Sequence, residues 1–585
     1  MSIKCEKVSL ALFAVALGAC SAYGDRQVFE VDSVVALTNA IDRANASPGE
    51  SGAQFDVIKL AAGVTFDLSS LSSYTSPDGL WGTMSAPANT SHGTSCLWFK
   101  KKIHFEGADT THWAEKKSTQ ESVLDGGNRA RIIYVYGQLD GALSTFKHIV
   151  FANGKADSSG NGGGLFSVGP SIYSPGTWNR DTTGFVTNCV FRACSAKEGG
   201  GSYKYNVFGS CFKDCTATGN GGGAYGTGNN GSNFGNVATN RFDACVFSGC
   251  TAADHGGGIY HDASHVLEGS LAGYIANCVF ENCTSKNGGG GVYLNVGGLI
   301  RDCEFTGNAC TANNGGALWN GTAVGCTFRD NRHCDQVWGR GGACLNVQCT
   351  RCTFSGLGDV CGGSLDRCVF DGVADVQVVR TASTEPTVAA TNCLICNSSA
   401  IYLANAGASA GGIEFANCTF AGNTVGVGTT AYATAQGEDN GLAGVAYCQS
   451  GFVTLKNCLF SGNRRKLAGE ETYCASDLRL KGTTASVTLS HCLFTAAEAP
   501  SDYQSASGVG TLVQGDPRFV AGNPDYPGLP YYSILRVSPA RNAGANAPWM
   551  ADAQDLAGRS RIYDSAVDIG CYECRIPPGL TITVQ

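Results

Sequence analysis

The densest group of side chains able to do acid–base chemistry lies between residues 254 and 265. Three of the nine histidines, two carboxylates and a tyrosine fall in this stretch: Asp254, His255, Tyr260, His261, Asp262 and His265. Such a group could supply a general-base pair or a metal site, and its candidate catalytic residues are His255, His261, Asp262 and His265. The alternative is a hydrated loop beside a glycine corner, because alternation along a strand sends Tyr260 and His261 to opposite faces.

Aromatic residues recur directly after runs of glycine. They are Tyr203, Tyr225, Tyr260, Tyr293 and Trp319. If they occupy one place in successive repeats, Tyr225, Tyr260, Tyr293 and Trp319 could form a stacking platform for sugar rings, and they are the candidate ligand-binding residues. An interior or clamp ladder that serves only the fold is the alternative.

The elements that position these residues are set by a Cys-x-Phe motif that recurs through the middle of the chain. Typical copies are Cys245-Val-Phe247 and Cys278-Val-Phe280. The first Cys of each unit is assigned to Cys189, Cys211, Cys245, Cys278, Cys303, Cys326, Cys352, Cys368, Cys393, Cys418, Cys458 and Cys492. Units of about 25 residues are typical of stacked solenoids.

Within each unit Cys and Phe are two residues apart, so in an extended strand both face the same side. Stacking equivalent strands would place Phe on Phe and Cys on Cys in a continuous interior column. Three residues after the Phe comes Asn, as in Asn331 and Asn423, or Cys, as in Cys250. This position is interpreted as an inward turn site where Asn tolerates left-handed geometry and bonds to the next coil. The glycine runs predict sharp corners that lead into a second short strand.

These repeats resemble a known class. Phe420-Ala-Gly-Asn423 and Gly315-Gly-Ala-Leu318 are similar to the repeats of polymorphic outer-membrane proteins, whose passenger regions are right-handed parallel β-helices. The resemblance covers roughly residues 140–500 and implies the fold, not the function. The C-terminal motifs, among them Gly515-Asp516-Pro517 and Val567-Asp568-Ile569-Gly570, resemble the choice-of-anchor type Q module of secreted bacterial β-helix proteins.

The N-terminus carries an export signal. Lys4 and Lys7 precede an apolar run from Val8 to Ala19, too short for a transmembrane helix, which predicts a signal peptide over 1–24. Plain secretion would start the mature chain at Asp25, whereas a lipobox-like stretch ending at Cys20 would give a lipid anchor. Both alternatives predict an extracellular or bacterial cell-surface protein without a transmembrane segment.

We expect an all-β, right-handed parallel β-helix with a short N-terminal capping helix and a non-repetitive C-terminal cap. Asp32 or Ser33 is the expected helix N-cap, and Val34, Leu37, Ile41 and Ala44 form its apolar face. The expected division is a signal peptide over 1–24, an N-terminal cap with the first coils over 25–139, β-helix repeats over 140–510 and a C-terminal capping module over 511–585.

Composition narrows the function classes. A net charge of −8 without a basic stripe argues against nucleic-acid binding. The 29 cysteines are expected to be mainly packed thiols with some disulfide bridges. Cys-x-x-Cys pairs such as Cys349 and Cys352 lack a histidine at zinc-finger spacing, so neither a metal nor a cofactor is expected.

Enzyme signatures known from other β-helices are mostly missing. Polygalacturonase-like chains carry several motifs on successive coils, but only His255-Gly256 appears, and the Arg-x-Pro-x-x-Arg pattern of pectate lyases is missing. The sequence favours a secreted or cell-surface scaffold for adhesion or for binding a carbohydrate or surface partner. The alternative is a polysaccharide lyase or glycoside hydrolase that acts on an extracellular glycan. Whether the protein is an enzyme stays uncertain, with the balance toward a binding protein.

Overall fold

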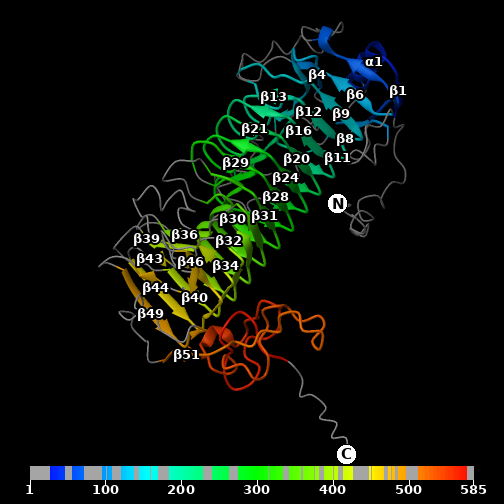
Figure 1. The fold of residues 1–585 in the computed structure, drawn as a ribbon. Helices are drawn as coiled ribbons and strands as arrows, with labels where there is room; N and C mark the ends of the chain where they lie inside the picture. The colour runs from blue at the N-terminus through cyan, green and yellow to red at the C-terminus, as the bar shows by residue number, and fades with distance from the viewer. Residues whose placement is uncertain are drawn as a thin grey trace, which may run out of the picture.

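In the computed structural model, successive sequence repeats form successive coils of a parallel β-helix (Figure 1). The structure describes residues 27–46, 56–71, 95–99, 102–108, 120–136, 144–158, 160–168, 184–227, 240–262, 274–313, 315–333, 341–357, 360–373, 376–380, 388–398, 401–405, 413–425, 447–448, 451–466, 472–475, 477, 479–480, 485–495 and 511–575. One coil runs from β22 (Ile259–Asp262) through β23 (Tyr274–Ala276), β24 (Val279–Glu281) and β25 (Thr284–Ser285) to β26 (Val292–Leu294), which pairs in parallel with β22.

Four sheets run along the solenoid, and the largest has 27 strands in two columns. The first column comprises β4 (Ser95–Phe99), β7 (Arg131–Tyr136), β10 (Leu165–Val168), β14 (Ser202–Tyr203), β18 (Ala224–Thr227), β22, β26, β36 (Val376–Arg380), β39 (Ile401–Asn405), β43 (Tyr447–Cys448) and β48 (Arg479–Leu480). The second comprises β1 (Val28–Val31), β2 (Asp56–Leu60), β5 (Ile103–Glu106), β8 (Thr145–Lys147), β11 (Phe185–Thr187), β15 (Asn206–Phe208), β19 (Arg241–Asp243), β23, β27 (Leu299–Arg301), β37 (Val388–Thr391), β40 (Ile413–Ala416), β44 (Gly451–Lys456) and β49 (Ala485–Ser490). The long strands β30 (Leu318–Val324), β32 (Cys344–Thr350) and β34 (Val360–Asp366) belong to both columns.

The second sheet has 16 strands and carries the Cys-x-Phe motif. Its strands are β3 (Thr65–Asp67), β6 (Ser122–Asp125), β9 (Ile149–Ala152), β12 (Val190–Arg192), β16 (Cys211–Lys213), β20 (Val246–Ser248), β24, β28 (Glu304–Thr306), β31 (Thr327–Arg329), β33 (Thr353–Gly356), β35 (Val369–Val373), β38 (Leu394–Cys396), β41 (Thr419–Ala421), β45 (Leu459–Ser461), β50 (Leu493–Phe494) and β51 (Val513–Gln514). The third sheet contains β13 (Ser195–Ala196), β17 (Thr216–Ala217), β21 (Thr251–Ala252), β25 and β29 (Ala309–Cys310), and the fourth contains β42 (Thr424–Val425), β46 (Arg464–Lys466) and β47 (Tyr473–Ala475).

The core is a stack of phenylalanine rings along the 16-stranded sheet. From Phe151 to Phe370 the ring centroids of successive coils lie 4.4–5.0 Å apart and the ring planes agree within 9°. Phe420, Phe460 and Phe494 continue the stack after Ile395 takes the place of one ring. The predicted register, with Phe upon Phe, is therefore confirmed, and so is the all-β parallel β-helix.

A column of small polarisable side chains runs beside the phenylalanines. The Cys245 N–H donates to Cys278 Sγ at 3.4 Å, and the Cys278 N–H donates to Cys303 Sγ at 3.4 Å. The assignment of Cys211 to this column was wrong. Phe212 stacks on Phe191, so Ser210, two residues before Phe212, takes the column position, and Cys211 alternates to the outer face where it is partly exposed.

The prediction of some disulfides is not met among the cysteines whose side chains the structure describes, all of which carry free thiols. In-register strands hold equivalent side chains about 4.8 Å apart, whereas a disulfide draws its two Cβ atoms to about 3.8 Å. Each column thiol instead donates to a carbonyl, as Cys278 Sγ does to the Ala276 oxygen at 3.1 Å. Regular stacking therefore favours packed thiols over bridges.

The position three residues after each Phe bonds between coils, as predicted. Asn308 Nδ2 donates to the Phe280 carbonyl at 2.9 Å and to Asn331 Oδ1 at 3.0 Å. The left-handed geometry, however, belongs to the preceding residue, as at Asn282 (φ 53°) and Gly307 (φ 66°). The buried Asn therefore satisfies backbone groups while its neighbour makes the turn.

One helix, α1 (Val34–Ala46), covers the N-terminal end of the solenoid. Ser33 is its N-cap, since Ser33 Oγ accepts the Ala36 N–H at 3.3 Å. Leu37, Ile41 and Ala44 are buried against the first coils, as their spacing predicts. Two short 3₁₀ helices, η2 (Ser69–Leu71) and η7 (Pro548–Met550), are also present. Among the described residues, no helix has the length and apolar character needed to cross a bilayer.

The non-repetitive residues 511–575 fold back onto the outer face of the 16-stranded sheet. Leu459 and Leu493 on that face pack against Ile534 and Ile569, and the Cys571 N–H donates to Thr419 Oγ1 at 2.9 Å. The segment begins as β51, the last strand of this sheet, so it both ends the stack and covers its side.

Candidate functional site

An aromatic column lies on the outside of the 27-stranded sheet. In each strand the residue before the aromatic one points inward, as Ala224 and Ile259 do with no exposed surface, so alternation turns the ring outward. Parallel pairing puts Tyr203 beside Tyr225, Tyr225 beside Tyr260, and Tyr260 beside Tyr293. We define the outer aromatic column as Tyr134, Phe166, Tyr203, Tyr225, Tyr260, Tyr293 and Trp319.

The rings of this column stack with the period of the coils. Centroid distances are 5.3 Å from Tyr134 to Phe166, 4.7 Å from Tyr203 to Tyr225, and 5.3 Å from Tyr260 to Tyr293. Tyr225 is 8% exposed, whereas Tyr203, Tyr260, Tyr293 and Trp319 are half-buried. The rings of the column thus pack against one another, as in a ladder that serves the fold. Those that are half-buried also present ring surface to solvent, as a stacking platform for sugar rings requires.

Carboxylate and amide groups border the middle of the column. Tyr225 Oη donates to Asp262 Oδ2 at 3.3 Å, and Asn295 Nδ2 donates to Asp262 Oδ1 at 3.1 Å. Burial raises the pKa of Glu198, opposed by the charge of Lys197. Fixed hydrogen-bond acceptors therefore lie beside the aromatic rings.

Lys204 is a cation that borders the middle of the column. Its Nζ lies 5.1 Å from the Tyr203 ring centroid, a cation–π distance. Burial lowers the pKa of Lys204, and the charges of Asp262 and Glu198 oppose that change. Lys204 is in a left-handed corner (φ 63°), at the position that aligns with Gly226 in the next coil.

Asp254 and His255 form a second polar group, at the corner that leads into β22. His255 Nδ1 lies 2.9 Å from Asp254 Oδ1, and Asn287 Nδ2 donates to the same oxygen at 2.7 Å. The His255 ring centroid is 4.4 Å from that of Tyr293, so the imidazole packs on the column. Both side chains keep exposed surface, 26% for His255 and 41% for Asp254.

The histidines predicted as one group are not brought together. His261 alternates inward, has no exposed surface, and its Nε2 faces the Asn240 carbonyl at 3.3 Å. Burial lowers its pKa to about 4, so the imidazole is neutral and enclosed in the solenoid. His265 lies outside the described residues. Of the candidate catalytic residues, the structure therefore places His255 and Asp262 at the outer surface and His261 in the core.

Sequence reasoning missed Glu198 and Lys204, which flank β14, and Asn295, which follows β26. Counting from the aligned tyrosines would have indicated Lys204 and Asn295, because they follow Tyr203 by one residue and Tyr293 by two. Arg131 was missed as well: its guanidinium lies 4.7 Å from the Phe166 ring centroid, and burial lowers its pKa to about 10.

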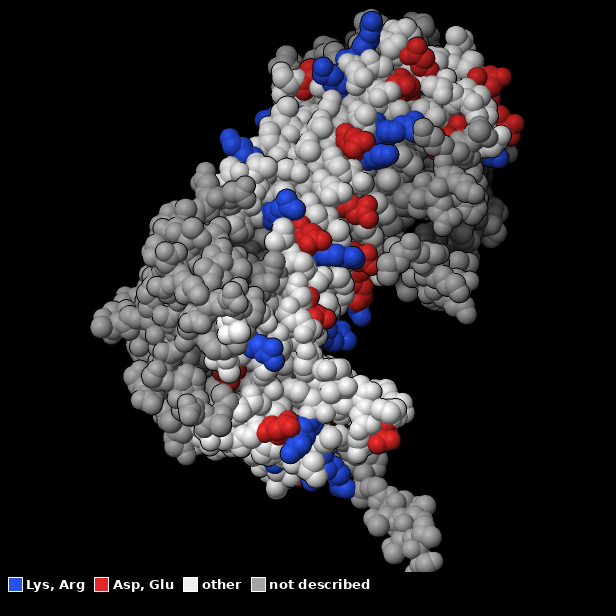
Figure 2. Space-filling view, in the orientation of Figure 1, with Lys and Arg blue, Asp and Glu red and all other residues white. Residues whose placement is uncertain are grey.

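The charges on the visible face of the solenoid are mixed. Figure 2 shows acidic and basic side chains interspersed along the coils in this view, without a broad basic area. Within the part of the chain that the structure describes, no three His, Cys, Asp or Glu side chains are grouped to hold a metal ion. The chemistry of the site therefore rests on ring faces, on hydrogen-bonding carboxylates and amides, and on Lys204, His255 and the buried Arg131.

No protein-family model and no curated protein matches the sequence. Among solved structures, the chain is similar to a mannuronic-acid-specific polysaccharide lyase of family 6 from human gut microbiota, with 10% identity and a TM-score of 0.33 over 84% of this chain and 91% of that chain. It is also similar to the PL6-family alginate lyase AlyGC, with 11% identity and a TM-score of 0.31 over 84% of this chain and 78% of that chain. At such scores neither similarity carries an inference about activity, and the fold rests on the pairing of the strands themselves.

Proposed function

We propose that this protein binds a glycan along the outer aromatic column. The observation that carries the proposal is the continuous ring stack on one outer face, in which Tyr203, Tyr260, Tyr293 and Trp319 are half-buried and Tyr225 is buried between them. Aromatic faces with a polar border suit the apolar C–H faces and peripheral hydroxyls of sugar rings. A rigid solenoid holds these faces in place before binding, which reduces the entropy lost when a partner is ordered.

The polar border supports a neutral glycan over a polyanionic one. Asp262, Glu198 and Asp254 place acceptors for sugar hydroxyls near the rings, whereas Lys204 and His255 are the cationic or titratable donors on the same face. A dense polyanion would meet carboxylates along the column, and like charges at close range oppose binding. We therefore expect neutral sugars to bind better than uronic-acid polymers.

The setting of this binding face is proposed to be extracellular. The support is the N-terminal sequence 1–24, which has the character of a signal peptide, with lipid attachment at Cys20 as the alternative. A secreted or surface-held solenoid with a glycan-binding side would act as an adhesion or carbohydrate-binding scaffold.

A glycan-degrading enzyme is the second candidate function, and one observation favours it. A carboxyl and an amine flank the same rings, and burial raises the pKa of Glu198 and lowers the pKa of Lys204, the directions expected of a general acid and a general base. The buried His261 takes no part in this alternative.

The binding proposal is tested with the purified chain on an array of neutral and acidic glycans, followed by calorimetry on the best ligand. Replacing Tyr260 and Tyr293 together by Ala removes two stacking faces, and at about 0.5–1.5 kcal/mol per aromatic contact the dissociation constant should rise about 5- to 150-fold. Tyr563→Ala is the matched control, because Tyr563 is 57% exposed in the C-terminal segment, away from the column. Equal affinity of the double variant and the control would contradict the proposal.

Catalysis is tested on the same glycans by following release of unsaturated products or reducing ends. Turnover that is lost in Glu198→Gln or Lys204→Met, with binding retained, would establish the enzyme and replace the scaffold. Binding without turnover supports the scaffold.

A further inference from the structure

The first strand of the largest sheet, β1, has an open edge. Among the described strands its one neighbour is β2, paired in parallel from Val28 with Val57 to Val31 with Leu60. The Gln27 and Val31 carbonyls accept the N–H groups of Val57 and Ala61, both at 2.9 Å. Because alternate residues of a strand direct their peptide groups to opposite sides, the peptide groups of Val28 and Glu30 face away from β2.

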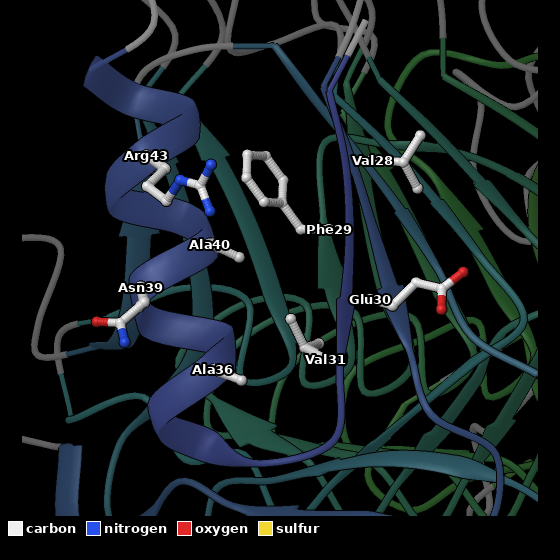
Figure 3. A pocket seen from close by; sticks show the side chains of 8 residues that line it. All are labelled: Val28, Phe29, Glu30, Val31, Ala36, Asn39, Ala40 and Arg43. Carbon is white, nitrogen blue, oxygen red and sulfur yellow. The ribbon is translucent and has the colours of Figure 1, made fainter.

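Helix α1 runs beside this edge and leaves a groove between itself and β1 (Figure 3). The groove has a volume of about 360 Å³. Phe29 and Val31 point into it from the strand, whereas Ala36 and Ala40 line the helix side with methyl groups only. Small residues on the helix keep the space beside the edge wide enough for a further extended chain.

Arg43 gives the groove a charge. Its guanidinium carbon lies 4.9 Å from the Phe29 ring centroid, and the side chain is exposed at the end of the helix. Figure 3 shows Arg43 on the groove side, with Glu30 directed away from it on the far side of the strand. An entering side chain at the Phe29 level therefore meets a cation that lies over a mostly buried ring.

From these features we infer that the groove is a docking site for an extended acidic segment of a partner protein, which adds to the sheet as a strand beside β1. Main-chain hydrogen bonds to Val28 and Glu30 would supply affinity, and a carboxylate facing Arg43 would supply specificity. This site lies at the N-terminal end of the solenoid and is independent of the glycan proposal.

The test uses the purified chain and two labelled hexapeptides with blocked ends, of alternating Thr and Val, that differ only in a central Asp or Lys. Fluorescence anisotropy should show binding of the Asp peptide and at least tenfold weaker binding of the Lys peptide. Arg43→Glu should reverse this order. Val35→Glu is the matched control, because Val35 is 69% exposed on the same helix, is not among the residues lining the groove, and should leave both affinities unchanged.

A second pair of variants tests strand addition itself. Glu30→Pro removes the outward N–H and is compatible with an edge strand, so it should abolish binding of the Asp peptide, whereas Glu30→Thr should retain it. Thermal melting shows whether both variants fold equally well. Binding that survives Glu30→Pro, or equal affinity for the two peptides, would overturn the inference. So would dimerisation of the chain that the Asp peptide displaces, because a second copy would then be the occupant.

Discussion

A buried carboxyl next to Asn463, which is one of the asparagines three residues after a repeat Phe, gives a sharp test of the packing. Asn463 Nδ2 donates to Asp477 Oδ1 at 2.7 Å, and Asp477 is 3% exposed. Burial raises the pKa of Asp477 from 3.8 to about 6, with the Asn463 hydrogen bond opposing the change. The folded protein therefore binds this proton more tightly than the unfolded chain does.

The contribution of Asp477 to the free energy of unfolding should fall as the pH rises. Stability associated with protonated Asp477 is fully present below about pH 4 and is lost as the pH rises through about 6. A shift of about two pH units corresponds to about 3 kcal/mol. Asp477→Asn keeps an acceptor for Asn463 and carries no charge, so it should stabilise the protein by up to about 3 kcal/mol at pH 8 and by less than about 0.5 kcal/mol at pH 3.5.

Urea unfolding at the two pH values measures this difference, and hydrogen exchange of the β41 and β45 amides reports whether the gain is local to these coils. Asp552→Asn, at an exposed carboxylate of the C-terminal segment, is the control and should change stability by less than about 0.5 kcal/mol at either pH. A stabilisation that is the same at pH 3.5 and pH 8, or a loss of stability at pH 8, would refute the burial argument.

Three further predictions test the columns. Gly223→Ala should destabilise by about 1–3 kcal/mol in urea unfolding, because its Cβ would lie 2.6 Å from Phe247 Cδ1; a change below about 0.5 kcal/mol would contradict the close approach. Ser210→Cys should leave the free energy of unfolding nearly unchanged, whereas Ser210→Ala should lower it by about 1–3 kcal/mol, because the Cys189 N–H loses Ser210 Oγ, its acceptor at 3.0 Å. Equal stability of the two variants would argue against the assignment of Ser210 to the column. In the native protein, Cys211 should react with maleimide before Cys189, as mass spectrometry of short reactions would show, because Cys211 is partly exposed and Cys189 is enclosed; the reverse order would place Cys211 inside.

The solenoid could be predicted from the sequence because the same physical requirement recurs in every repeat. Every unit must bury Phe and its partner two residues earlier, so the repeat period and the inward face follow without knowledge of the loops. The error at Cys211 came from aligning cysteines instead of phenylalanines. A buried ring fixes the register more strongly than a small side chain does, since Ser210 fills the same slot.

The outer aromatic column could be predicted in part. Glycine runs identified Tyr225, Tyr260 and Tyr293 as equivalent, and alternation separated Tyr260 from His261, which the structure confirms by burying the imidazole. Of the alternatives that the sequence left open for the histidines, alternation holds for His255 and His261, because His261 points into the core, while His265 lies outside the described residues.

The polar border could be predicted only in part, because its members come from the separate coils of β14, β22 and β26. Asp262 raises the pKa of Lys204 from two coils away, whereas Glu198 does so from the same coil, and Lys204 reaches the column through a left-handed corner. Such corners depend on the backbone of adjacent coils and leave no periodic signal.

Positions that break the repeat are therefore better guides to function here than positions that obey it. Residues in register, such as Phe280, are explained by stacking alone, since any change there disturbs the coils on either side. Lys204, His255 and Asp262 have no counterpart of the same type in the paired coil, so stacking does not require them. All three lie beside the outer aromatic column, between the coils of β14 and β26, and this coincidence of irregular polar residues with a regular ring surface is what locates the glycan site proposed for this face.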